Sequence, residues 1–533
     1  MSTTKEKLAE ELERVAGLMA LAGENDFKVR AYERGAEALL KAAKTDSDLT
    51  AIAAGTVKVP GIGEGLRAAM AEFLETGAIK AAVDLEAAVP AALWEFTKLP
   101  GLGAKKARVI HEELGINTLG ELAYACQENR LLKLKGFGPS TQTKILENIE
   151  RMKRNAGRFL MNEAHAMADA LLGTFPVGWR AVKVGELGRS CEVVGRFEFA
   201  VHGASRKELE AFAKKQKSME NLHLEPIDVP FDELPALQRQ RLMAPEKIRR
   251  RLDHVGKPLT TKEGALWESS WLEEEWEGRV PPRDAYRRSV HGAVKGVFHN
   301  HTNRSDGSAT LEEMVHEAER LGLQYIGISD HSQTAFYAHG LKADELLEQH
   351  EEIKKLQKKV KVKIFHGVES DILADGALDY PKSILEKLDF VVGSIHSRFQ
   401  MDPVAMTERL VKALAHPLLT FWGHPTGRLL LGRDAYSFDW DAVFKSAKKH
   451  GVVFELNANP QRLDLDWRMG ARLVEQGIPL CINPDAHSVE GLSDTRWGEA
   501  MAEKAMVPAD LVLNLRGVDD MEHWLRRRKR SGQ

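Results

Sequence analysis

The sequence predicts a multidomain protein with a helical N-terminal region, an α+β middle domain and a C-terminal α/β barrel. Its 533 residues exceed what one hydrophobic core serves, because single domains rarely grow beyond about 300 residues. Helical periodicity runs through residues 5–155 and is interrupted three times by similar glycine-containing turns. From residue 291, short apolar strands alternate with amphipathic helices, which is typical of an α/β barrel.

These changes of pattern divide the chain into five expected segments. They are an N-terminal helical domain with the first glycine turn (1–85), a second helical domain with two such turns (86–158), an α+β domain (159–235), a charged connector (236–290) and the barrel (291–533).

Composition predicts the cellular compartment and indicates which partners to expect among nucleic acids and membranes. The chain has 75 basic and 78 acidic residues, so any contact with nucleic acid must come from a local basic surface. The 3 cysteines, Cys126, Cys191 and Cys481, form no CxxC pair and fit a reducing compartment. The N-terminus is charged and no run of 18 apolar residues occurs, so we expect a cytoplasmic protein without a membrane partner.

The three glycine turns share one form, in which two glycines flank an apolar residue and a helix comes next. They read "VKVPGIGEGLRAAM" from Val57, "TKLPGLGAKKARVI" from Thr97 and "LKLKGFGPSTQTKI" from Leu132. Such turns expose backbone N–H groups at a helix start, where a DNA phosphate can bind. The predicted DNA-binding residues are Gly61, Gly63, Gly101, Gly103, Lys105, Lys106, Gly136 and Gly138.

A single glycine turn can equally be a plain connector between two helices. The threefold repetition favours DNA binding, and so does a local excess of basic residues between Arg130 and Arg158. A solvated charged helix face would carry a similar excess.

The turns resemble helix-hairpin-helix motifs, and with the preceding stretch "NDFKVRAYERGAEALL" they resemble the N-terminal and fingers regions of the bacterial family X DNA polymerases. The family's palm domain would come next, with two aspartates that bind magnesium. Its counterpart here is "VGELGRSCEVVGRFEFAV", residues 184–201, in which the glycine framework is present. Glu186 replaces the expected serine, and Arg196 and Glu198 replace the two aspartates.

We therefore expect a degenerate palm, because a cation at the first ligand position repels the metal ion that nucleotidyl transfer requires. The alternative is an unrelated α/β linker domain. A third carboxylate strand and a nucleotide-binding stretch are also not evident between His202 and Val290. Whether such a palm retains any nucleotide binding stays open.

Polar side chains follow the apolar runs of the last segment. In "GVFHNHTNRSDG", His299 and His301 lie two apart and so share one face of a strand, and Asp306 returns from the following loop. Barrel enzymes place catalytic residues at such strand ends. The residues collected in this way are His299, His301, Asp306, His331, Glu369, His396, His424, Asp485 and His487. Imidazoles with carboxylates suit zinc, manganese or iron(II), and this set is large enough for more than one ion.

This pattern resembles the PHP phosphoesterase domain, a distorted barrel that holds three metals. The resemblance implies a first metal on His299, His301, Glu369 and Asp485, a second on Glu369, His396 and His424, and a third on Asp306, His331 and His487, with Glu369 bridging. It makes the ligands of the first metal the catalytic set. Arg428 and Arg398 are candidates to hold the phosphate, unless they form ordinary salt bridges, and Arg462 is a further candidate.

The hypothesis favoured by the sequence is a DNA-repair enzyme that removes nucleotides from DNA 3′ ends, with manganese, zinc or iron in three sites. The substrates would be gapped or 3′-ended DNA. Three alternatives stay open: an active gap-filling polymerase with an associated exonuclease, a DNA-binding repair scaffold with structural metals, and a small-molecule phosphatase.

Overall fold

The structure of the protein is a computed structural model that describes residues 4–43, 45–127, 129–216, 219, 221–260, 264–267, 269–273 and 294–531. It consists of two compact units, Met1–Ala156 and Gly157–Gln533. Within the described residues, none of the helices combines the length and the apolar character that crossing a membrane requires.

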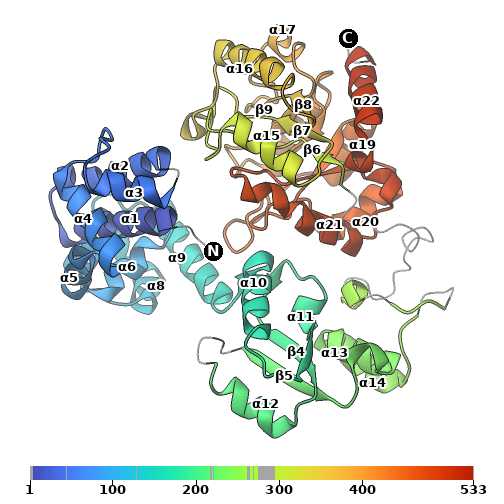
Figure 1. The fold of residues 1–533 in the computed structure, drawn as a ribbon, viewed down its shortest axis with the longest axis horizontal. Helices are drawn as coiled ribbons and strands as arrows, with labels where there is room; N and C mark the ends of the chain where they lie inside the picture. Colours follow the sequence, from blue (N-terminus) through green and yellow to red (C-terminus); the bar gives the residue numbers. More distant parts are fainter. Residues whose placement is uncertain are drawn as a thin grey trace. The chain divides into compact units, whose positions relative to one another are not determined.

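The first unit is helical (Figure 1). Its helices are α1 (Thr4–Ala22), α2 (Asp26–Ala42), α3 (Asp46–Ala53), α4 (Glu64–Thr76), α5 (Lys80–Ala88), α6 (Ala91–Thr97), α7 (Ala104–Leu114), α8 (Leu119–Gln127) and α9 (Pro139–Asn155), with the 3₁₀ turn η1 (Arg130–Lys133). Each glycine turn is followed by a helix, α4, α7 or α9, as the sequence predicts. The apolar residue between the glycines, Ile62, Leu102 or Phe137, is buried and anchors each turn in the helical core.

The second unit begins with an α+β domain built on the three-stranded sheet β2-β4-β5. Its elements are β1 (Phe159–Leu160), α10 (Met161–Leu172), β2 (Arg180–Val184), α11 (Gly185–Gly188), β3 (Val193–Val194), β4 (Phe197–His202), α12 (Arg206–Ala213), β5 (Leu222–Ile227), η2 (Phe231–Glu233), α13 (Ala236–Met243), α14 (Glu246–Val255) and η3 (Ser269–Trp271). Strand β4 pairs antiparallel with β2 and parallel with β5.

The described residues of the segment 236–272 belong to this domain and do more than connect. Ile248 and Leu252 of α14 pack with Val184 and Ala200 of the sheet in one buried cluster. The amphipathic pattern of α14 indicates this packing, but its many basic residues predict a charged connector. The rest of the expected connector, 274–290, lies outside the described residues.

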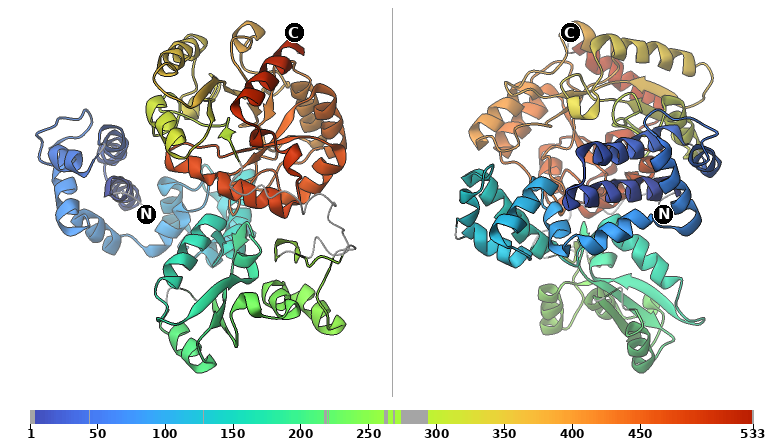
Figure 2. Two further views of the ribbon diagram at one scale, coloured as in Figure 1. Left: turned by 45° about the vertical axis from the view of Figure 1, so that its right-hand side comes forward. Right: turned by 90° about the vertical axis from the view of Figure 1, so that its left-hand side faces the viewer.

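The remainder of the second unit is the expected barrel of parallel strands and surrounding helices, visible from two sides in Figure 2. Its strands are β6 (Gly296–Val297), β7 (Tyr325–Ile328), β8 (Lys363–His366), β9 (Glu369–Asp371), β10 (Val392–Ser394), β11 (Phe421–Trp422), β12 (Val453–Asn457) and β13 (Leu480–Asn483). Its helices are α15 (Leu311–Arg320), α16 (Ala343–Leu356), α17 (Lys382–Leu385), α18 (Pro403–Leu414), α19 (Trp440–His450), α20 (Trp467–Gln476), α21 (Thr495–Lys504) and α22 (Val518–Ser531), with the 3₁₀ turns η6 (Phe336–Ala338), η7 (Glu490–Asp494), η8 (Ala509–Leu511) and η9 (Leu513–Leu515).

The strands form two sheets, β6-β7-β8 and β13-β12-β11-β10-β9. An isolated β-bridge joins the two sheets on each side. Asn300 pairs with Ala486 and His331 pairs with Glu369, which closes a distorted barrel. The ring of Phe298 fills the interior and packs against Tyr325, Phe365, Phe390 and Phe421. Because the strands are parallel, their carboxyl ends lie at the same end of the barrel. The interior is filled by apolar side chains, so polar side chains gather at that end.

Candidate metal centre

The nine predicted ligands all come from the carboxyl ends of the barrel strands or the loops after them. His299 and His301 follow β6, and His331 follows β7. Glu369 follows β8 and is also the first residue of β9. The loops after β10, β11 and β13 supply His396, His424, Asp485 and His487, and Asp306 returns from the loop after β6. Side chains from the first and the last strand of the barrel therefore meet at one end of it.

Glu369 lies at the centre of this cluster and is fully buried. Its Oε1 is 3.2 Å from His299 Nε2, 2.9 Å from His424 Nε2 and 3.2 Å from His396 Nε2. Its Oε2 is 2.8 Å from His331 Nδ1. One carboxylate thus reaches ligands of all three groups that the resemblance implies.

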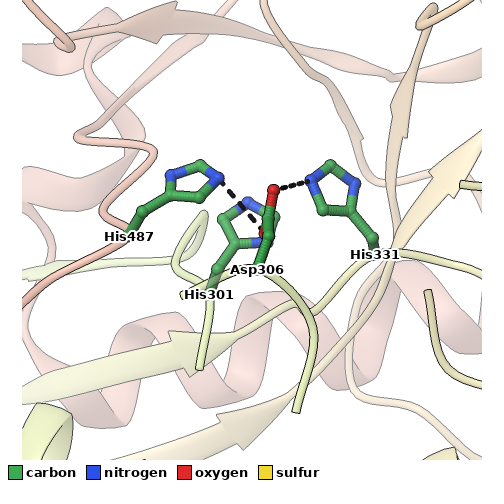
Figure 3. A group of neighbouring side chains, drawn as sticks. All are labelled: His301, Asp306, His331 and His487. Carbon is green, nitrogen blue, oxygen red and sulfur yellow. Dashed lines mark ion pairs between the residues drawn. The ribbon is translucent and has the colours of Figure 1, made fainter. Parts of the chain in front are cut away.

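Asp306 is the carboxylate of a second group with His301, His331 and His487 (Figure 3). Its oxygens lie 3.4 Å from His331 Nε2, 3.4 Å from His487 Nε2 and 3.8 Å from His301 Nδ1. The imidazole of His301 stacks on those of His331 and His487, with ring centroids 4.4 and 4.2 Å apart. His301 therefore borders two groups, because its Nε2 is also 3.1 Å from Asp485 Oδ1.

Two buried carboxylates that the sequence analysis did not select hold the histidines in place. Glu455 Oε2 is 2.7 Å from His299 Nδ1, and its Oε1 accepts a hydrogen bond from the His424 backbone N–H at 2.9 Å. Asp371 Oδ1 is 2.7 Å from His396 Nδ1. A carboxylate on one ring nitrogen directs the other nitrogen into the cluster and makes it a better ligand.

The charges in the cluster shift its pKa values in opposite directions. Burial alone would lower the pKa of His331, but the carboxylates of Glu369 and Asp306 outweigh it and raise that pKa to about 10. Burial would also lower the pKa of His487, but the carboxylates of Asp306 and Asp485 outweigh it and raise that pKa to about 9. Burial and the neighbouring imidazoles His487 and His331 lower the pKa of His301 to about 4. His331 and His487 thus hold protons that balance carboxylate charge, whereas His301 does not.

The residues fit divalent cations. Three sets of ligand atoms lie within 4.8 Å of one another: His301, Asp306, His331 and His487; His299, His301 and Asp485; and His331, Glu369 and His396. Among the described residues, His301 Nδ1 is buried without a hydrogen-bond partner, and the Asp306 oxygen beside it is 3.8 Å away. Buried polar atoms of this kind are costly unless they bind something, and a metal ion would satisfy them.

Backbone strain coincides with the ligands. His424 has a φ of 25° and Asp485 a φ of 51°, values that non-glycine residues rarely adopt. Such strain is held in place by the surrounding structure and is found preferentially at functional sites.

The structure assigns Arg428 a different role from the catalytic one expected from sequence. Its guanidinium is buried and binds Glu192, Asp466 and the backbone oxygens of Arg462 and Leu463, so its nitrogens are engaged within the protein. Arg462 is the arginine that faces the cluster, with its Nε 3.3 Å from Asp485 Oδ2. The partners of Arg428 lie far from it in sequence, which is why its own motif gave no sign of them.

The glycine turns of the first unit combine left-handed glycines with helix starts that no side chain caps. Gly61, Gly101 and Gly136 have φ values of 91°, 81° and 90°, which favour glycine. Gly63, Gly103 and Gly138 are the N-caps of α4, α7 and α9, and no side chain caps these three helices. The side chains of Lys105 and Lys106 are near the second turn, where Lys105 Nζ is 3.0 Å from Asp26 Oδ2 and Lys106 Nζ is 3.4 Å from Gly101 O.

The α+β domain at the start of the second unit, here called the palm-like domain, carries Glu186, Arg196 and Glu198 at the positions of the expected polymerase residues. These positions contact one another. Arg196 Nη2 lies 3.8 Å from Glu198 Oε1. Glu186 Oε2 accepts hydrogen bonds from the backbone N–H groups of Gly195 and Arg196, at 2.6 and 3.0 Å.

Comparison with known proteins agrees with this architecture. Residues 298–459 match the PHP domain family, residues 3–79 the helix-hairpin-helix domain, and residues 93–151 the SAM-like helix-hairpin-helix tandem. The chain is 31% identical to the DNA polymerase/3′-5′ exonuclease PolX of Bacillus subtilis (strain 168) over 97% of this chain and 98% of that protein. A probable phosphatase of Caldanaerobacter subterraneus subsp. tengcongensis is 30% identical over 44% of this chain and 92% of its own length.

Among solved structures, the histidinol phosphate phosphatase of Lactococcus lactis subsp. lactis Il1403, complexed with zinc, L-histidinol and phosphate, is 18% identical. It covers 40% of this chain and 94% of its own, with a TM-score of 0.31.

The barrel and its cluster of histidines and carboxylates define a metal-dependent phosphoesterase with a PHP domain. The chain as a whole belongs to the PolX family, the bacterial family X DNA polymerases with a C-terminal PHP domain.

Proposed function

We propose that the protein is a metal-dependent 3′-5′ DNA exonuclease whose reaction takes place at the end of the barrel. The observation that carries this proposal is the convergence of six imidazoles and two further carboxylates around Glu369 in a chain that also holds three helix-hairpin-helix turns. The full-length similarity to an enzyme named as a polymerase and 3′-5′ exonuclease supports the choice of DNA over a small phosphate ester.

The proposed ligand sets follow the order expected from sequence, with two additions. His299, His301, Glu369 and Asp485 would hold the first metal, and Glu369, His396 and His424 the second, with His331 at its edge. Asp306, His331 and His487 would hold the third, together with His301. Manganese, zinc and iron(II) all accept these ligands. Bound cations would lower the pKa of a water molecule, neutralise the phosphate and stabilise the leaving oxygen.

The chain's own residues would then orient the substrate. Arg462 is only 18% exposed, and its Nη1 has no hydrogen-bond partner among the described residues. A guanidinium next to the cluster suits a non-bridging phosphate oxygen, because charge-assisted hydrogen bonds are short and strong. Glu455 and Asp371 would keep His299 and His396 in a fixed orientation during the reaction.

The helical unit would bind the DNA backbone. A Cβ added at Gly63, Gly101, Gly103, Gly136 or Gly138 would have open space around it in the part of the chain that the structure describes, so the backbone at these positions is open to a phosphate. The uncapped starts of α4, α7 and α9 supply N–H groups and a positive helix dipole end. Contacts of this kind bind DNA without regard to base sequence.

We also propose that the chain does not extend primers. Nucleotidyl transfer requires several carboxylates around two cations, and Arg196 brings a positive charge to the place of the first. Glu198 is paired with Arg196, and the Glu186 carboxylate occupies the backbone N–H groups of residues 195 and 196. A nucleotide triphosphate, which is also negatively charged, would have to displace the Glu186 carboxylate from these N–H groups.

One assay tests both proposals: 5′-labelled primer-template DNA with manganese, with and without nucleotides. We expect stepwise shortening from the 3′ end in either condition and no extension. Extension by even one nucleotide that is lost on Arg196→Ala with Glu198→Ala would refute the degenerate palm. The change Arg196→Asp with Glu198→Asp is expected not to restore synthesis.

A further inference from the structure

A buried glutamate of the palm-like domain contacts the barrel directly. Glu192 lies between α11 and β3 and is 8% exposed. Its Oε1 accepts a hydrogen bond from Arg428 Nη2 at 2.8 Å, and its Oε2 accepts from Trp467 Nε1 at 3.1 Å and from Arg468 Nη1 at 3.2 Å. These three donors belong to two parts of the barrel, the loop after β11 and the start of α20.

Arg428 connects the two loops next to this contact. It follows the ligand His424 by four residues, in the loop after β11. Its Nε donates to Arg462 O at 2.9 Å, and its other nitrogens bind Leu463 O and the Asp466 carboxylate. The two loops are further joined where the Thr426 N–H donates to Asp464 Oδ2 at 3.0 Å. One guanidinium therefore fixes the backbone on which Arg462 is carried.

The position of Arg462 matters because its side chain lies beside the ligand Asp485, at 3.3 Å. A continuous series of contacts thus runs from Glu192 through Arg428 and the Arg462 carbonyl to the metal centre. Removing one partner of a buried charged contact reduces the compensation of the other charge, and without Glu192 the Arg428 guanidinium would keep the carboxylates of Asp466 and Asp464. A small rearrangement of the loop would then displace the Arg462 guanidinium.

A second buried contact between the same two domains does not reach the centre. Lys504 of α21 is 1% exposed, and its Nζ donates to Glu273 Oε1 and to Arg189 O, each at 3.1 Å. Arg189 Nε donates to the same glutamate oxygen at 2.9 Å. None of these hydrogen bonds involves the loops that carry His424 or Arg462, but this contact lies beside that of Glu192. Cys191 Sγ donates to Glu273 Oε1 at 3.2 Å, and Lys504 Nζ is 4.8 Å from the ring centroid of Trp467. Because Glu273→Gln keeps every donor to Glu192, it serves as a control for the general effect of weakening the domain contact.

We propose that Glu192 is a positioning residue of the phosphoesterase, so that the palm-like domain serves the barrel's reaction after losing the carboxylates of its own. This inference rests on the proposed function. It explains why the domain keeps a buried ionic contact at Glu192 while the positions of its expected metal ligands hold Arg196 and Glu198. Glu192 would act on the phosphate only through Arg428 and Arg462.

The test compares Glu192→Gln, Glu192→Asp and Glu273→Gln in the full-length, manganese-loaded protein. The substrates are single-stranded DNA and bis(p-nitrophenyl) phosphate, a diester too small to need the helical unit. We expect Glu192→Gln to lower kcat on both substrates by about tenfold to a hundredfold, because small misplacements of a positioning group have effects of this size. Metal content and DNA affinity are expected to stay at wild-type values.

The controls separate positioning from stability. Glu273→Gln is expected to lower the Tm at least as much as Glu192→Gln but to keep kcat within about twofold. Adding Glu192→Gln to Arg428→Met is expected to cause no further loss of kcat, because both changes interrupt one series of contacts. If Glu192→Gln does not fold, Glu192→Asp gives the same comparison with the charge retained at a shorter reach.

Two results would overturn the inference. One is wild-type kcat in a folded Glu192 variant, and the other is an equal loss of kcat in Glu273→Gln. If instead the wild-type protein hydrolyses neither substrate with manganese, the proposed function itself fails, and that outcome is distinct from both.

Discussion

At the scale of single residues, buried carboxylates orient the imidazoles of the metal centre. His299 places Nδ1 against Glu455 and Nε2 toward Glu369 and Asp485. His396 does the same with Asp371 and Glu369. Each arrangement fixes the tautomer that coordination requires, since the nitrogen facing the supporting carboxylate carries the proton and the other has a lone pair.

Glu455→Gln is therefore expected to weaken metal binding by about tenfold to a hundredfold and to lower kcat accordingly. The amide can still accept one hydrogen bond, but it lacks the charge that increases the basicity of His299. The measurement is metal affinity by calorimetry, with Glu499→Gln as the control, because Glu499 is also a buried barrel glutamate and accepts a hydrogen bond from the Val294 N–H. Equal affinities in the two variants would contradict the orienting role.

Metal affinity is also expected to depend on pH. The carboxylates around His331 and His487 raise their pKa values to about 10 and about 9, so both imidazoles are protonated at neutral pH in the metal-free protein. A metal ion must displace these protons, and binding therefore strengthens as pH rises from about 6 toward about 9. Calorimetry in two buffers of different ionisation enthalpy measures the released protons. No proton release at neutral pH would refute this account.

The clustering of the nine histidines and carboxylates was predictable from sequence because each stands beside an apolar strand, but the residues that support the cluster were not. Glu455 lies inside β12 and Asp371 ends β9, both buried. Glu455 could have been recognised as the single charged residue within an otherwise apolar strand. Asp371 could have been recognised by its two-residue spacing from Glu369, which puts both side chains on one face of the strand. The partner of Arg428 depends on tertiary contacts that no local pattern contains.

At the scale of elements, the three helix-hairpin-helix turns combine a left-handed glycine with an uncapped helix start. The repeat made these elements predictable from sequence, since the glycine spacing predicts the turn and the helical periodicity predicts the next helix. The segment 236–272 shows the opposite case. Its charge pattern resembles an exposed connector, but Ile248 and Leu252 on one face of α14 suffice to pack it on the sheet.

Replacing Gly101 by alanine together with Gly103 by valine is expected to weaken DNA binding several-fold and to reduce its salt dependence. Gly101 has a φ of 81°, and both positions are open, so added side chains project toward an approaching phosphate. The control is Gly115→Ala, which places a similar left-handed strain at the opposite end of α7. Binding measured over a range of salt concentrations separates the two. The same affinity and salt slope as wild type would make the second turn a mere connector.

At the scale of the whole molecule, the chain retains the order of a family X polymerase, but its clustered acidic residues that could hold metal ions lie in the barrel. Asp485, Glu369 and Asp306 are there, whereas Arg196 and Glu198 pair with each other in the palm-like domain. The order of the domains was predictable from sequence. The ionic contacts of Glu192 and Lys504 that hold two of the domains together were not, because each joins residues more than 200 positions apart.

In the proposed function, the cluster around Glu369 hydrolyses DNA while the helical unit binds it. The most direct test measures manganese-dependent digestion and DNA affinity side by side for wild type, His299→Ala and Asp485→Ala. We expect digestion to fall to background in both variants, because each removes a buried ligand, and affinity to stay close to wild type, because the helix-hairpin-helix turns are unchanged. Digestion at the wild-type rate by either folded variant would contradict the account.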